Sequence, residues 1–370
     1  MADKVEIAEK ERRVREFLGR HDLGGALFLK QSSFAWMTCG GDNHMTLAGD
    51  RGASSLLVTR EAKYVLADRI EAARMMEEEA LEDQGFHLVT YEWHEADPIA
   101  EARMLCPGPL VFDVGMPGDR PELAPELHKM RWSLLLQEVE RYREVGKLAG
   151  EAMQAACLRV ERGWSEHEIA GVLAKEMMDR EIIPYLVLVA ADERIYQYRH
   201  AIPTGKRLDK HAMLVICAEK WGLIVSLTRF VHFGAVPSEL RKRQLAVARI
   251  DAAFIAGTRP GAKVGEIFEA GLRAYAESGY PDEWLLHHQG GATGYEARNY
   301  KAVPGDEHVV EENQAFAWNP SITGAKSEDT IIALSGGPEV ISPTPLLPEI
   351  VYVARGKVQG LTRPDVLEKV

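Results

Sequence analysis

Two kinds of side chain in the second half of the chain could carry proton-transfer chemistry, an imidazole and a carboxylate. His200 ends a polar stretch that begins at Tyr196, and Glu328 lies in a segment that we predict to be an inward-facing strand. An imidazole titrates near neutral pH, and a carboxylate can act with it as a general acid or base. A buried carboxylate needs a partner, whereas a structural hydrogen bond to a backbone carbonyl would also explain His200. Both residues are candidates for catalysis.

Other common site motifs are absent from the sequence. The run Gly290–Gly294 lacks the Gly-Lys-Ser/Thr ending of a phosphate-binding loop and the Gly-x-Gly-x-x-Gly spacing of a dinucleotide fold, so it predicts close strand packing and turns. No Cys-x-x-Cys pair occurs, which excludes a zinc ribbon and a thioredoxin-like motif. Reduced thiols in a cytoplasm are the simplest interpretation of the four separated cysteines, Cys39, Cys106, Cys157 and Cys217.

Composition narrows the class of protein. The 370 residues suggest two domains, and 46% hydrophobic with 27% charged residues is typical of a folded globular protein. The 44 basic and 56 acidic side chains give a formal charge of -12, which disfavours nucleic acid and an anionic membrane as partners. No apolar signal region or membrane-spanning stretch is apparent in the sequence. We therefore expect a cytoplasmic protein.

The order of the expected elements indicates an α/β first half and a mixed second half. Apolar runs predict first-half strands, and periodicity predicts a surface helix and a second helix. The strands are expected at 25–29, 54–58, 62–66 and 110–112, and the helices at 5–18 and 69–81. A long helical pattern starts at Ser133 after a cluster of turn signals. We place the domain boundary there, with domains at 1–131 and 132–370.

The second half begins with helices and then mixes strands with helices. Ser165 and Glu168 have the spacing of a capping box and predict a helix start. Strands are expected at 185–189, 213–216 and 222–225, and helices at 240–257 and 264–278.

Seven local patterns follow one another in this half. They are Gly163–Glu166, His200–Thr204, Lys210–Ala212, Trp221–Arg229, His288–Glu296, Trp318–Ile322 and Lys326–Asp329. In this order they resemble the creatinase, aminopeptidase P and prolidase superfamily, whose catalytic domain has the pita-bread fold. The stretch Gly24–Gly40 is similar to the first domain of that superfamily. The resemblance implies an N-terminal creatinase-like α/β domain followed by a C-terminal pita-bread catalytic domain, in a protein of the α+β or α/β class.

The resemblance implies a metal site, but this sequence departs from the family's usual ligands at several positions. Metallopeptidases of the superfamily bind two divalent cations through two aspartates, one histidine and two glutamates. His288 and Glu328 stand at two of these positions, but Ser226 and Asn319 replace an aspartate and a glutamate. The other aspartate has no clear equivalent. Neutral side chains cannot offset two cations, whose desolvation costs on the order of several kcal/mol or more. We expect no metal and no other cofactor.

Creatinase, in the same superfamily, splits a C–N bond of a small guanidino compound without metal. His200 corresponds to the histidine in its His-x-x-Pro stretch, and Glu328 corresponds to the carboxylate in its closing Glu-Asp strand. His288 completes the expected catalytic set. Thr228 stands where creatinase has a glutamate, which makes creatine itself doubtful as the substrate. We expect a metal-independent creatinase-like hydrolase of a small metabolite, with His200 and Glu328 in general acid–base catalysis.

Four further residues are expected to bind substrate, Tyr295, Arg298, Asn319 and Arg229. Tyr295 stands where peptidases of this fold use a substrate-binding histidine and can offer a hydroxyl, and Arg298 can clamp a carboxylate in a bidentate way. Three of the candidate residues also have structural explanations. Tyr295 can be a packing residue, Arg298 a solvated loop charge, and His288 a core histidine that remains after loss of the metal.

Two other functions fit the same residues. One is a Xaa-Pro aminopeptidase or dipeptidase with unusual metal ligands, in which Glu219 or Cys217 joins His288 and Glu328. The other is a catalytically inactive pita-bread scaffold that binds a ligand or a protein in the pocket that serves as the active site in its relatives. The expected partner is a small-molecule substrate, without nucleic acid or membrane. A homodimer is also expected, because in dimers of this superfamily the loop after Gly40 approaches the partner subunit's site.

Overall fold

The computed structural model describes residues 3–114, 119–352 and 361–370. Contacts divide the chain into two compact units, of which the first runs to Glu138 and includes Trp221–Leu223. All other residues belong to the second unit. The division falls in the first turn of α6 (Leu136–Arg159), a few residues after the predicted boundary at 131/132.

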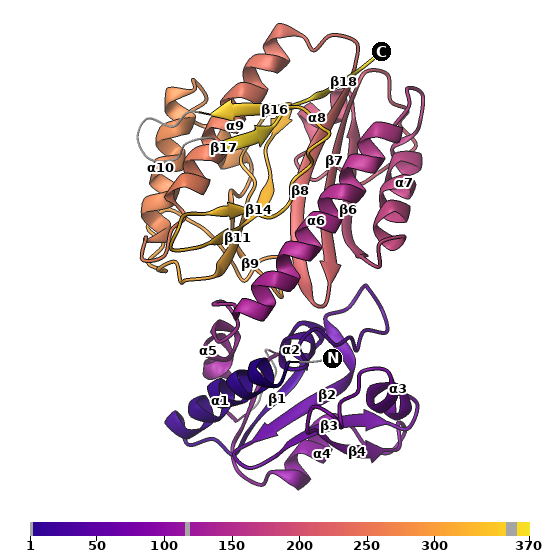
Figure 1. Cartoon of the computed structure of the whole chain (residues 1–370), viewed down its shortest axis with the longest axis vertical. Coiled ribbons are helices and arrows are strands. Elements are labelled where there is room, and N and C mark those ends of the chain that lie inside the picture. The colour runs from indigo at the N-terminus through magenta and orange to yellow at the C-terminus, as the bar shows by residue number, and fades with distance from the viewer. Residues whose placement is uncertain (1–2, 115–118, 353–360) are drawn as a thin grey trace. The chain divides into compact units, whose positions relative to one another are not determined.

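The first unit contains one mixed sheet with the strand order β4-β3-β2-β1-β5 (Figure 1). The β1–β5 and β3–β4 pairs are parallel, and β2 is antiparallel to both of its neighbours. The strands are β1 (Gly25–Lys30), β2 (Arg51–Thr59), β3 (Lys63–Asp68), β4 (His87–Tyr91) and β5 (Leu110–Phe112). The helices are α1 (Lys4–Arg20), α2 (Gln31–Met37), α3 (Ala72–Glu77), α4 (Pro98–Leu105), the 3₁₀ turn η1 (Pro121–Leu123) and α5 (Ala124–Lys129). The four predicted strands are confirmed, whereas α3 is shorter than the predicted helix and β4 was not predicted.

Helix α1 contains a buried charge cluster that the sequence did not predict. Its many charges indicated a surface helix, but Lys10 and Glu6 are completely buried. The ammonium of Lys10 lies 2.6 Å from Glu6 and 2.9 Å from Glu138, and it donates to the carbonyl of Trp36 at 2.6 Å. Because a buried charge is costly without its partners, Glu138 ties the first turn of α6 to this unit. This contact explains why the division lies beyond residue 131.

The second unit has two larger sheets with the strand orders β18-β8-β7-β6 and β10-β9-β11-β14-β15. Its helices are α6, α7 (Glu166–Met178), α8 (Glu193–Gln197), α9 (Ser238–Gly257), α10 (Val264–Glu277) and the 3₁₀ turn η2 (Glu283–Leu286). The first strands along the chain are β6 (Ile183–Ala191), β7 (His211–Lys220), β8 (Leu223–Phe233), β9 (Gly290–Thr293), β10 (Tyr300–Lys301) and β11 (Gln314–Trp318). The later strands are β12 (Ser321–Ile322), β13 (Ala325–Lys326), β14 (Asp329–Ala333), β15 (Glu339–Val340), β16 (Glu349–Tyr352), β17 (Leu361–Pro364) and β18 (Leu367–Lys369).

Several local predictions for this unit are confirmed. Ser165 and Glu168 form the predicted capping box at the start of α7. The predicted helices at 240–257 and 264–278 are α9 and α10, and the predicted strands lie within or overlap β6, β7 and β8. Among the described residues, no helix has both the length and the apolar character needed to cross a membrane.

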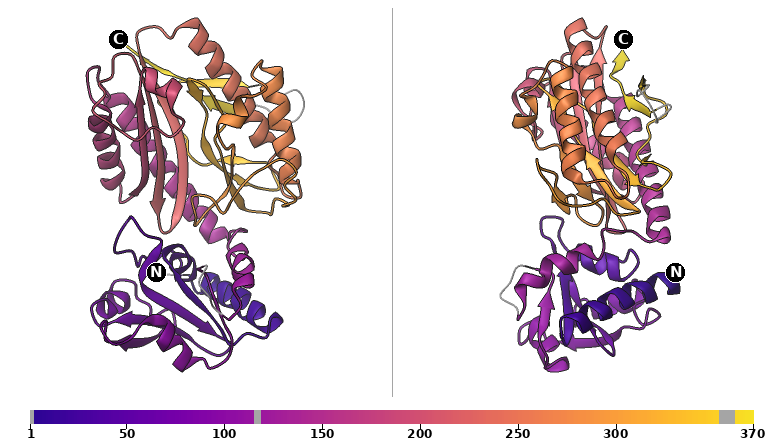
Figure 2. Two further views of the ribbon diagram at one scale, coloured as in Figure 1. Left: turned by 180° about the vertical axis from the view of Figure 1, so that it is seen from behind. Right: turned by 90° about the vertical axis from the view of Figure 1, so that its left-hand side faces the viewer.

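Helices α9 and α10 lie against the sheet that contains β11 (Figure 2), and an aromatic core packs between the helices and the sheet. Phe254 on α9 stacks on Trp318 of β11 with ring centroids 4.7 Å apart, and the indole of Trp318 donates to the hydroxyl of Thr258 at 2.9 Å. A Cβ on Gly271 would lie 2.1 Å from the ring of Phe254, so this close approach requires glycine. The core fixes the end of β11, and Asn319 is the next residue.

The two larger sheets are joined by an isolated antiparallel bridge between Thr228 on β8 and Glu328. The backbone N–H of Thr228 donates to the carbonyl of Glu328 at 3.2 Å. Glu328 immediately precedes β14, so the bridge brings the middle of β8 against the start of β14 in the other sheet.

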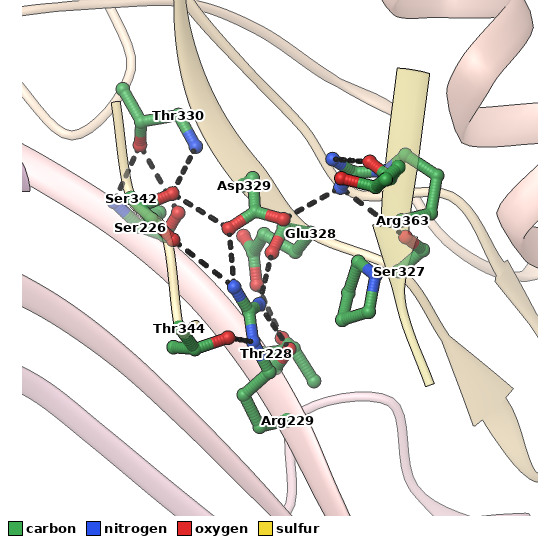
Figure 3. A network of polar contacts seen from close by, with 12 residues as sticks. Ser226, Thr228, Arg229, Ser327, Glu328, Asp329, Thr330, Ser342, Thr344 and Arg363 are labelled. Carbon is green, nitrogen blue, oxygen red and sulfur yellow. Dashed lines mark hydrogen bonds and ion pairs between the residues drawn. The ribbon is translucent and has the colours of Figure 1, made fainter. Parts of the chain in front are cut away.

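A buried network of charges holds β8, β14 and β17 together (Figure 3). The two carboxylate oxygens of Asp329 accept hydrogen bonds from Arg229 at 2.8 Å and from Arg363 at 2.7 Å. Ser342 donates to the same carboxylate at 2.6 Å, and Arg363 also pairs with Asp251 of α9 at 2.5 Å. The four charged residues are at most 3% exposed. Two guanidinium groups and two carboxylates therefore balance one another inside the unit.

We expect Asp329→Asn to lower the free energy of unfolding by about 3–5 kcal/mol, because the substitution leaves a buried guanidinium without its countercharge. Chemical denaturation of the variant and the wild type measures the difference. Glu277→Gln is the matched control, because the Arg249–Glu277 pair is about half exposed and such pairs contribute at most about 1 kcal/mol. Equal losses in the two variants would contradict the structural role of the network.

Candidate active site

Three histidines gather in the second unit. His200 lies in the loop after α8, and His287 and His288 lie between η2 and β9. The Nε2 atoms of His200 and His287 are 3.1 Å apart, and the rings of His287 and His288 stack with centroids 4.6 Å apart. His200 is exposed, His288 is half-buried and His287 is buried. His287 was not predicted, although the His-His doublet in the sequence is a signal that could have identified it.

The three imidazoles are neutral at pH 7. Burial, and then the nearby Lys326, lower the pKa values of His200 and His287 below the ordinary range. Burial, together with the charges of Arg298 and Lys301, lowers the pKa of His288 to about 4. Each ring therefore keeps a nitrogen lone pair that can accept a proton or bind a ligand.

Glu328 is buried and fully engaged. Its carboxylate lies 2.8 Å from the ammonium of Lys326 and 3.5 Å from the guanidinium of Arg298, and it accepts a hydrogen bond from the Thr228 hydroxyl at 2.6 Å. Burial alone would raise the pKa of Glu328, but Lys326 and Arg298 hold it below its usual value. The group is thus a stable anion.

The predicted cooperation of His200 with Glu328 needs correction. Glu328 affects the charge state of His200 electrostatically, but no hydrogen bond joins the two side chains among the described residues. The carboxylate of Glu328 instead contacts Thr228 and Lys326, and Nε2 of His200 contacts Nε2 of His287. The structure therefore pairs His200 with another histidine, and Glu328 acts as an electrostatic neighbour. Lys326 was not predicted as a site residue.

The positions that hold two cations in the metallopeptidases do not fit such a centre here. Cys217 on β7 and Ser226 on β8 lie side by side, with Sγ and Oγ 3.2 Å apart, and burial raises the pKa of the Cys217 thiol. Asn319 is buried, and its side-chain oxygen has no hydrogen-bond partner in the part of the chain that the structure describes. Glu328 is held by Lys326. Glu328, even with Glu219 of β7 as a second carboxylate, cannot replace the four carboxylates of a two-cation site.

Some of the residues predicted to bind substrate lie in the site, and others lie outside it. Arg298 contacts Glu328 and belongs to the site, and Asn319 lies one residue beyond Trp318, which pairs with Asp329. Tyr295 is only 1% exposed. Arg229 is a correction, because its guanidinium is used inside the protein. It donates to Asp329 at 2.8 Å, to the Thr344 hydroxyl at 2.8 Å and to the Thr228 carbonyl at 2.8 Å, so it holds strands together rather than a substrate.

Comparison with known protein families assigns the chain to one of them. Residues 140–334, more than half of the chain, match the model of metallopeptidase family M24. No curated protein sequence matched the chain.

Solved structures give the same fold. A prolidase from Pyrococcus horikoshii OT3 is similar with a TM-score of 0.74 and 18% identity, over 91% of this chain and 98% of that chain. An X-Pro aminopeptidase from Thermotoga maritima MSB8 has a TM-score of 0.74 and 14% identity, over 90% and 98%. The N-terminal domain of FACT complex subunit SPT16 from Cicer arietinum has a TM-score of 0.67 and 12% identity, over 93% and 97%. These likenesses confirm the predicted pita-bread fold.

We expect Lys326→Met to destabilise the protein by about 3–5 kcal/mol, because it leaves the buried carboxylate of Glu328 without its nearest cation. Adding Glu328→Gln should recover part of this loss, with a coupling energy of about 1–3 kcal/mol in a double-mutant cycle measured by denaturation. Lys175→Met, in an exposed pair with Asp179 on α7, serves as the control and should cost at most about 1 kcal/mol. Strictly additive effects of the two site substitutions would show that the pair is not coupled.

Proposed function

Since this chain belongs to metallopeptidase family M24, we propose that it is a hydrolase of a C–N bond in a small metabolite that works without the two-cation centre of its relatives. The proposal is carried by the neutral Ser226 and Asn319, which stand where the resemblance expects acidic ligands, with Cys217 against Ser226, beside a cluster of neutral histidines. This activity is creatinase-like, because proton transfer by side chains replaces activation of water by metal.

The charges of the site favour an anionic substrate. Lys326 and Arg298 flank Glu328, and Lys301 acts on the same histidines. Among the charges that act most strongly on His200 and His288, these three cations therefore outnumber the one carboxylate, Glu328. A substrate carboxylate would pair with a guanidinium such as Arg298 in a bidentate way, so we propose an amide, ureido or guanidino compound that also carries a carboxylate.

His200 is the proposed proton-transfer residue. Its Nε2 faces Nε2 of His287 at 3.1 Å, which orients the ring and leaves Nδ1 for the reaction. In the proposed reaction, His200 accepts a proton from water as the water oxygen forms a bond to the substrate carbon. The same proton then passes to the leaving nitrogen as the C–N bond breaks. The products are an amine and the oxygenated fragment, and the enzyme returns to its starting state.

A Xaa-Pro dipeptidase or aminopeptidase remains the second candidate, because the family match and the structures of similar fold favour peptide bonds. A cavity of about 10 Å³ beside His287 and Lys326 has room for about one water, so either kind of substrate would approach from the exposed side of His200. The homodimer and the cytoplasmic location stay predictions.

We expect His200→Ala to lower kcat/KM by about 10²–10⁴-fold, the usual contribution of a general acid or base. The assay is hydrolysis by the purified full chain of a panel of carboxylate-bearing amides, ureido and guanidino compounds and Xaa-Pro dipeptides. His94→Ala, which changes an exposed histidine of the first unit, is the matched control and should retain wild-type rates. Equal turnover by His200→Ala and the wild type would exclude the proposed mechanism.

Treatment with a chelator separates the two candidate functions. We expect the wild type to keep its rate after dialysis against EDTA, because the residues of the family's two-cation site cannot hold that centre. Metal content by mass spectrometry and the rate before and after dialysis are the measurements. A rate that is lost with EDTA and restored by Mn²⁺ or Co²⁺ would favour the metallopeptidase instead.

A further inference from the structure

We infer that His200, His287 and His288 form a binding site for one divalent transition-metal ion of the zinc, cobalt or nickel class. One ring nitrogen of each residue lies within 4.8 Å of the corresponding nitrogens of the other two. The nitrogens of His200 and His287 are 3.1 Å apart, near the distance of about 3.3 Å that separates two nitrogens on a tetrahedral zinc ion. This site differs from the centre used by the metallopeptidases, which takes a single histidine and four carboxylates.

The protein already orders the three rings. Arg199, the neighbour of His200, donates to Glu283 at 2.7 Å, which ties the loop of His200 to η2. The next two residues after η2 are His287 and His288, whose rings stack on each other. Ligands that are ordered before binding lose little conformational entropy when an ion arrives.

The donor atoms select the kind of metal. Three imidazoles suit zinc, cobalt, nickel and copper, whereas magnesium, calcium and manganese prefer oxygen ligands. Nε2 of His287 contacts only Nε2 of His200 among the described hydrogen bonds of that atom, so an ion that binds both rings would replace this contact. Nδ1 of His288 accepts one long hydrogen bond, 3.3 Å from the backbone nitrogen of Gly290, which is weak enough to be exchanged for an ion.

Neighbouring charges set the strength of binding. Lys326, Arg298 and Lys301 act on these rings as positive charges, and Glu328 offsets only part of them. The cations oppose a second positive ion, so binding should be weaker than in sites whose histidines are supported by carboxylates. Lys301 is exposed, so its charge can be removed without disturbing the buried contacts.

The consequence for the enzyme rests on the proposed function. A metal ion bound to the cluster occupies the lone pair of His200 and prevents that ring from accepting a proton. The ion should therefore inhibit a hydrolase that uses His200 for proton transfer. Binding of the ion itself does not depend on that activity.

The test is titration of the metal-stripped full chain with Co²⁺, followed by visible absorption, and with Zn²⁺, followed by calorimetry. We expect one ion per chain with nitrogen coordination. His200→Ala should weaken binding about tenfold or more, and Lys301→Ala should strengthen it severalfold. His94→Ala should leave it unchanged. Thermal melting checks that each variant is folded, which we expect because His200, Lys301 and His94 are all exposed.

Unchanged affinity in His200→Ala would overturn the inference, because the ion would then be held elsewhere. Two ions per chain, lost in Glu328→Gln but kept in His200→Ala, would overturn it in favour of the family's centre. In the hydrolysis assay, Zn²⁺ should inhibit over the same concentrations at which it binds. If no compound of the panel is hydrolysed, the proposed function fails but the titration still decides whether the site exists.

Discussion

The ion network around Asp329 is the interaction on which the architecture of the second unit depends. Arg229 approaches Asp329 from β8, and Arg363 approaches it from β17 and also reaches Asp251 on α9. Because these charges are buried, none can lose its partner without a large cost. The network therefore fixes β14 against β8. The next residue back along the chain is Glu328, so the same constraint sets the bridge to Thr228 that joins the two larger sheets.

The candidate site has a positive charge balance around its histidines. Cys217 and Ser226 contact each other as neutral groups, and Lys326 pairs with Glu328. Among the charges that act most strongly on His200 and His288, the cations outnumber the one carboxylate. The same positive charges and burial keep the three histidines neutral, which supports both proton transfer and the binding of an anionic substrate.

Local patterns predicted well wherever nearby residues decide the structure. The capping box of Ser165 and Glu168 and the helix over 264–278 were predicted because a few adjacent side chains determine them. The predicted surface helix is confirmed in α1, but the burial of Lys10 was not predicted, because its partner Glu138 comes from a distant part of the chain. The assignment of Arg229 to substrate needed correction for the same reason, since its partner Asp329 lies 100 residues away.

The sequence by itself determined the family and the two-domain order, because both depend on which motifs occur along the chain and in which order. Only the tertiary structure decided which side chains meet. His200 and His287 are 87 residues apart, yet their nitrogens face each other at 3.1 Å. Thr228 and Glu328 are 100 residues apart, yet they are hydrogen-bonded. Such contacts follow from the packing of whole sheets against one another, and no local pattern encodes them.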